Sequence, residues 1–146
     1  MRRKLPFQLT LLFLLILLGI IWQAVRFVTS IAWYNTLELY APTPGPIYIG
    51  ATGVVWMLAG LFLLWSFWVG VRWNRAAILI ASSLYAVWVW ADRLFVQTRM
   101  QANWPFDLAA TIILLAYTAI VVLNPRNRIY FEREAYERES QNPPSA

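Results

Sequence analysis

The residues of this chain that could support chemistry are a few charged side chains set in apolar sequence. The run WVWADRLFVQ, residues 88–97, places Asp92 and Arg93 side by side at the end of a long apolar segment. Asp107 begins the next apolar segment, and Arg26 interrupts the first one. Two carboxylates near one another can serve acid–base catalysis, whereas a guanidinium can bind an anionic headgroup. The sequence therefore offers either an aspartate-based reaction or an anion-binding site.

The absence of cysteine and histidine narrows the chemistry further. It removes disulfides, thiol nucleophiles, thiolate metal sites, histidine-ligated haem and histidine proton relays. We therefore expect no metal site and no cofactor. The net charge of +5 comes from basic residues that flank apolar runs. Because such residues act there as topology signals, we also expect no nucleic-acid partner.

The composition is that of a membrane protein. Hydrophobic residues make up 60% of the chain and charged residues 13%, against about 25% charged residues in an ordinary soluble domain. We predict an all-α integral membrane protein in which four transmembrane helices pack as a bundle, formed by residues 1–125. A charged cytoplasmic tail or short helix follows at residues 126–146. The predicted spans are residues 7–28, 47–70, 76–95 and 106–123.

The distribution of basic residues predicts the orientation. Most of them fall on one side of the predicted bundle, and only Arg93 and Arg99 fall clearly on the other, with Arg26 close to it. Both termini should therefore be cytoplasmic, in agreement with an even number of spans. The segment LNPRNRIYF, residues 123–131, resembles the close of many small four-span bacterial membrane proteins, which implies a bacterial inner membrane. The basic residues on the predicted cytoplasmic side are Arg2, Arg3, Lys4, Arg72, Arg75, Arg126 and Arg128.

Polar residues share helix faces near the predicted outer surface. Gln23 and Arg26 lie on one face of the first span, and Tyr85 and Asp92 lie on one face of the third. At about 1.5 Å per residue, Asp92 lies near the outer edge of a hydrocarbon core about 30 Å thick. We expect Asp92 to pair with Arg26, while Arg93 contacts lipid phosphate or shares the aspartate. These five residues are the candidate binding site. The alternative interpretation is that they only fix how the helices pack against each other.

Aromatic and small residues inside the spans allow two interpretations each. The intramembrane tryptophans could line a groove for a pigment or a lipid tail, or pack between helices. The small residues of the second span, Gly50, Gly53, Ala59 and Gly60, allow close helix approach within the chain or with a partner. In the tail, we expect four apolar or aromatic residues among the charges either to dock a cytoplasmic partner or to lie on the membrane surface. These are Ile129, Tyr130, Phe131 and Tyr136.

Three functional classes remain. We favour a non-catalytic accessory or assembly subunit that contacts other membrane-protein subunits, a second copy of itself and membrane lipids. The alternative is a protein that binds or transports a lipid or small ligand at Arg26, Asp92 and Arg93. A third class is an aspartate-dependent membrane enzyme that uses Asp92 and Asp107. The sequence lacks the Asn- and Ala-containing motifs around the aspartates of four-span lipoprotein signal peptidases, and it lacks the mid-membrane ionisable group of a coupled transporter.

Overall fold

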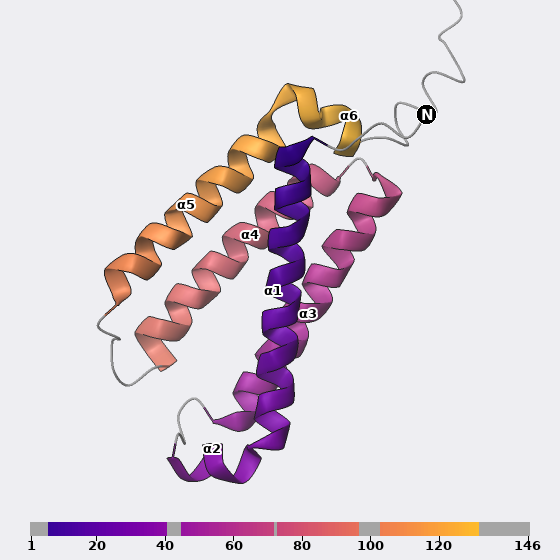
Figure 1. Ribbon diagram of the computed structural model, residues 1–146. Coiled ribbons are helices and arrows are strands. Elements are labelled where there is room, and N and C mark those ends of the chain that lie inside the picture. Colours follow the sequence, from indigo (N-terminus) through magenta and orange to yellow (C-terminus); the bar gives the residue numbers. More distant parts are fainter. Residues whose placement is uncertain (1–5, 41–44, 72, 97–102, 132–146) are drawn as a thin grey trace, which may run out of the picture.

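Four long helices run back and forth along a common direction in the computed structural model, which describes residues 6–40, 45–71, 73–96 and 103–131 (Figure 1). All four are long and apolar enough to cross a membrane, as expected of a multi-pass membrane protein. The spans predicted from the sequence are thus confirmed as helices. The long helices are α1 (Phe7–Ala32), α3 (Pro46–Val69), α4 (Asn74–Ala91) and α5 (Trp104–Leu123). The short elements are α2 (Tyr34–Tyr40), the π-helix η1 (Asp92–Val96), the 3-10 helix η2 (Pro125–Asn127) and α6 (Arg128–Phe131).

The array has two distinct ends (Figure 1). The terminal end holds the start of α1, the turn between α3 and α4, and α6. The loop end holds α2, the start of α3, η1 and the start of α5. The most extensive packing joins α1 to α3, followed by α4 to α5, and α3 also touches α4. The described helices are therefore arranged as two pairs that lie side by side.

Glycines bring α1 and α3 close together. A Cβ atom added at Gly53 would lie 3.0 Å from the Gln23 carbonyl oxygen and 3.3 Å from the Phe27 backbone nitrogen. One added at Gly60 would lie 2.5 Å from Cγ1 of Ile20. Glycine therefore lets the two helices approach more closely than a residue with a side chain would. Of the two interpretations of these small residues, the structure shows the first, contact within the chain.

The apolar core lies toward the terminal end. Its buried residues come from α1, α4, α5 and α6, with Phe67 of α3 packed against it. Phe131 is fully buried, and its ring meets that of Phe67 at 5.6 Å in an edge-to-face arrangement. The core of the chain itself encloses this ring, and docking of a partner by Phe131 stays a prediction. The buried core residues are Leu9, Leu12, Ile78, Val121, Val122 and Phe131.

Polar side chains next to this core bind backbone carbonyls at the end of α5. After α5 ends, Asn127 Nδ2 donates to the Val121 carbonyl at 2.9 Å, and Arg75 Nε donates to the Val122 carbonyl at the same distance. Carbonyls in the last turn of a helix have no partner within it, so these bonds satisfy acceptors that would otherwise lie buried. They also fix the turn that carries α6 back onto the core. Tyr130 packs there as well, whereas the side chains of Ile129 and Tyr136 lie outside the described part of the chain.

Candidate functional site

The predicted polar residues meet in the half of the molecule nearer the loop end. Gln23 is almost fully buried on α1, and its Nε2 donates a hydrogen bond to the Tyr85 hydroxyl on α4 at 3.0 Å. Arg26 reaches back to the Gln23 side-chain oxygen at 3.5 Å. The sequence predicted the faces on which these residues lie, and the structure brings the two faces together.

Aromatic rings surround this polar contact. The Arg26 guanidinium lies over the Trp88 ring at 5.2 Å from its centre, which is the geometry of a cation–π interaction. Trp56 of α3 packs edge-on against Tyr85 at 4.9 Å and lies 5.5 Å from Trp88. Of the two interpretations of the intramembrane tryptophans, Trp56 and Trp88 follow the second, packing between helices. In contrast, Trp65 and Trp68 point outward from α3 and are largely exposed on the protein surface.

Asp92 is buried where α4 passes into the π-helix. Tyr48 of α3 lies close to Asp92 and to Trp88. Tyr48 is also close enough to Arg26 and Asp92 to interact electrostatically with both. Tyr48 was not among the predicted site residues, because it stands near the start of an apolar run and nothing in that run marks it. The direct Arg26–Asp92 pair stays a prediction.

Arg93 makes an ion pair that the sequence did not predict. Its NH1 atom lies 2.6 Å from Oδ2 of Asp107, in the first turn of α5. The guanidinium also lies 5.8 Å from the centre of the Trp90 ring. The sequence predicts that Arg93 contacts lipid phosphate or shares Asp92, and it suggests Asp107 only as part of a catalytic pair. The structure instead joins Arg93 and Asp107, so these two residues connect α4 to α5.

We refer to Gln23, Arg26, Tyr48, Tyr85, Trp88 and Asp92 as the polar cluster. Within the described residues no group of three or more acids is placed to hold a metal ion. The two aspartates of the suggested catalytic pair have different surroundings, since Asp107 faces Arg93 and Asp92 faces Tyr48. Comparison with protein-family models, curated proteins and solved structures finds no match. The polar cluster must therefore be interpreted from its own geometry.

Proposed function

We propose that this chain is a non-catalytic subunit of a larger membrane complex and acts through contacts between its helices and those of partner proteins. The observation that supports this best is the hydrogen bond between Gln23 and Tyr85. In this bond, two polar side chains inside the spans bind each other. A polar group that binds substrate needs free donors or acceptors facing an opening. A buried pair between helices instead fixes how the helices pack.

Outward-facing apolar side chains supply the surface for such contacts. Trp68 on α3 is 84% exposed, and Phe106 on α5 is 73% exposed. Aromatic rings bury a large area when a partner helix covers them, and they are common anchors of protein interfaces. In a bilayer the same faces contact lipid wherever no partner covers them. The proposed partner is another membrane protein.

We further propose that the terminal end faces the cytoplasm of a bacterial cell and that the helices span its inner membrane. The support is the distribution of charge in the sequence. The basic residues at positions 2–4, Arg75 and Arg126 adjoin the ends of the spans that meet at the terminal end. A cysteine introduced at Phe7 and another introduced at Asn103 would report the two sides by their labelling with a membrane-impermeant thiol reagent in intact cells. Labelling of the Phe7 position alone would contradict this orientation.

The experiment that tests the proposed function is purification of the tagged full chain in mild detergent, with a photo-reactive residue at Trp68 or at Gly19. Both positions face outward, but Gly19 lies on α1 and has nothing within 4 Å of the position of a Cβ. A stoichiometric partner that cross-links at one face and not at the other would support the proposal. Purification of the chain alone, with only lipid adducts at both positions, would contradict it.

A second candidate function rests on Arg26. Among the described residues its guanidinium has one hydrogen bond, at 3.5 Å, and a guanidinium carries five N–H donors. The remaining donors suit the phosphate of an anionic lipid at the level of the polar cluster. Arg93 is the matched control because its guanidinium is already bound by Asp107. Anionic lipid that co-purifies with the native chain should be lost in Arg26→Gln and kept in Arg93→Gln. Equal lipid content in all three would exclude this candidate.

A further inference from the structure

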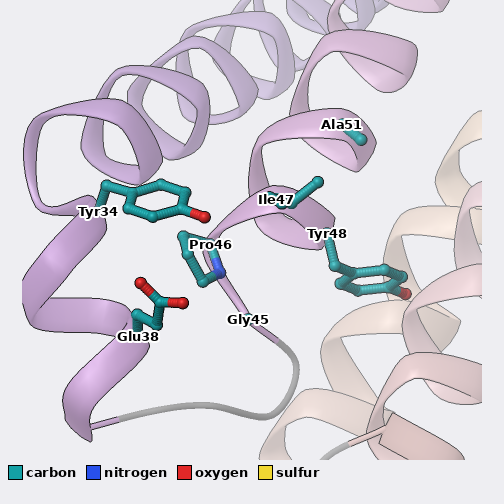
Figure 2. Close-up of a pocket in the computed structure, with 7 residues that line it drawn as sticks. All are labelled: Tyr34, Glu38, Gly45, Pro46, Ile47, Tyr48 and Ala51. Atoms are coloured by element: carbon teal, nitrogen blue, oxygen red, sulfur yellow. The ribbon is translucent and has the colours of Figure 1, made fainter.

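An open recess lies between α2 and the first turns of α3, at the loop end (Figure 2). Its volume is about 620 Å³. It shares Tyr48 with the polar cluster, and the predicted site residues are absent from its described lining. The lining residues are Tyr34, Glu38, Gly45, Pro46, Ile47, Tyr48 and Ala51.

The recess lies at the depth of lipid headgroups. Helix α1 has 26 residues, which corresponds to about 39 Å at 1.5 Å per residue, longer than a hydrocarbon core of about 30 Å. Helix α2 begins two residues after the end of α1 and runs across that end of the array (Figure 1). A span of this length places α2 beyond the hydrocarbon, where headgroups and water meet. A ligand in the recess would therefore meet an interface rather than acyl chains alone.

The polar side of the recess is formed by α2. Tyr34 and Glu38 are four residues apart, so they share one face of that helix, and Figure 2 shows both side chains directed toward Pro46. Pro46, Ile47 and Ala51 make the opposite side apolar. The charged side chain among the described lining residues is the Glu38 carboxylate, and none of them is cationic. The recess thus combines an anion, an aromatic ring and an apolar wall.

We propose that this recess binds the ammonium group of an amine-bearing membrane lipid. The Glu38 carboxylate is the counter-ion and accepts hydrogen bonds from the ammonium, since charge-assisted bonds of this kind are the stronger ones. The Tyr34 ring offers its face to the same cation. The apolar wall of α3 contacts the methylene groups next to the amine. An anionic headgroup without an amine meets only the repulsion of Glu38, so the recess selects by charge.

This inference goes beyond the proposed function, because it assigns a ligand to a site that the proposed protein contacts do not use. It is also distinct from the anion site at Arg26, since the two sites take opposite charges, although both adjoin Tyr48. A lipid with both phosphate and amine could occupy either site. The charge of Glu38 therefore has to be varied by itself.

The test uses the full chain in detergent, exchanged with phosphatidylethanolamine or with phosphatidylglycerol, and native mass spectrometry counts the bound lipid. We expect Glu38→Gln to reduce the retention of phosphatidylethanolamine by roughly five- to tenfold without lowering that of phosphatidylglycerol. No effect of Glu38→Gln on the retention of phosphatidylethanolamine would overturn the proposal.

A matched control keeps the net charge and moves its position. Thr36 is two residues from Glu38 and is not among the described lining residues, so the double variant Thr36→Glu with Glu38→Gln carries the carboxylate on another face of α2. Retention of phosphatidylethanolamine as weak as in Glu38→Gln supports the recess, and recovery to the native level contradicts it. Free ethanolamine distinguishes the source of the amine. Competition at millimolar concentration means that the ammonium alone is recognised, whereas no competition means that the lipid tail contributes as well.

The ring of Tyr34 gives a second, independent variant pair. Tyr34→Phe keeps an aromatic face and should retain phosphatidylethanolamine at close to the native level. Tyr34→Leu removes the face and should lower retention several-fold. Circular dichroism and thermal unfolding of each variant verify that the helices are intact. Full retention by Tyr34→Leu would contradict the contact between ring and cation.

Discussion

Arg93 and Asp107 form an ion pair 2.6 Å long that joins the end of α4 to the first turn of α5. Both side chains are mostly shielded, with 21% and 24% of their surfaces exposed. The same carboxylate lies near the start of α5, where a negative charge is also favoured by the helix dipole. The adjacent Asp92 faces α3 instead, through Tyr48. Asp92 and Arg93 are adjacent in the sequence, but they therefore contact two different helices, α3 and α5.

The first prediction concerns this ion pair. Arg93→Gln and Asp107→Asn should each lower the free energy of unfolding by about 1 kcal/mol, and the double variant should lose little more than either single one. The reason is that each single change removes the same contact. Thermal unfolding in detergent, followed by tryptophan fluorescence, measures the three variants. Losses that add in full would show that the two residues act independently.

The second prediction concerns the contact between α1 and α3. Gly53→Ala should lower the free energy of unfolding by about 1–3 kcal/mol, because the new methyl group would meet the backbone of α1, which cannot move without separating the helices. Gly19→Ala is the matched control, since nothing lies within 4 Å of its Cβ position. That change should be neutral or stabilise the helix by up to about 1 kcal/mol. An equal gain in both variants would mean that helix propensity, and not packing, decides the result.

The third prediction concerns the partly buried hydrogen bond between Gln23 and Tyr85. Tyr85→Phe leaves the Gln23 amide buried without this acceptor, so we expect a loss of about 1–3 kcal/mol in the free energy of unfolding. Adding Gln23→Met should recover most of it, because the buried amide that lacks its acceptor is then gone and Arg26 loses only a long contact of 3.5 Å. Chemical unfolding in detergent measures both variants. A double variant less stable than Tyr85→Phe would contradict a role limited to packing and would point to a further use of Gln23.

The sequence was sufficient to predict the four spans, because long apolar runs bounded by prolines, glycines and charges have few other solutions in a membrane protein. It also predicted which residues share a helix face. It could not predict which faces meet, since this depends on the rotation of each helix about its axis. The π-helix adds to the difficulty. It begins at Asp92, and its wider turn changes the directions expected from α-helical spacing. Arg93 therefore points toward α5, which spacing alone does not indicate.

The end of the chain shows a second limit of the sequence. Charged residues around Phe131 make the segment resemble a solvated tail. The direction of the segment is set instead by the turn after α5, where Asn127 and Arg75 bind carbonyls of the last helical turn. These contacts join residues from separate parts of the sequence, and they return Phe131 to the core. The recess between α2 and α3 was missed for a similar reason, because it depends on how two helices approach each other.

The fourth prediction follows from the position of Phe131. Its ring is fully buried and packs against Phe67, so Phe131→Ala should lower the free energy of unfolding by about 3–5 kcal/mol, as expected when a buried ring leaves a cavity. Tyr40→Ala is the control, since Tyr40 is 80% exposed at the other end of the array and should change stability by less than about 0.5 kcal/mol. The same measurement separates the two roles considered for this ring. A residue that docks a partner would leave the stability of the isolated chain unchanged when removed, whereas a core residue would lower it before any partner is added.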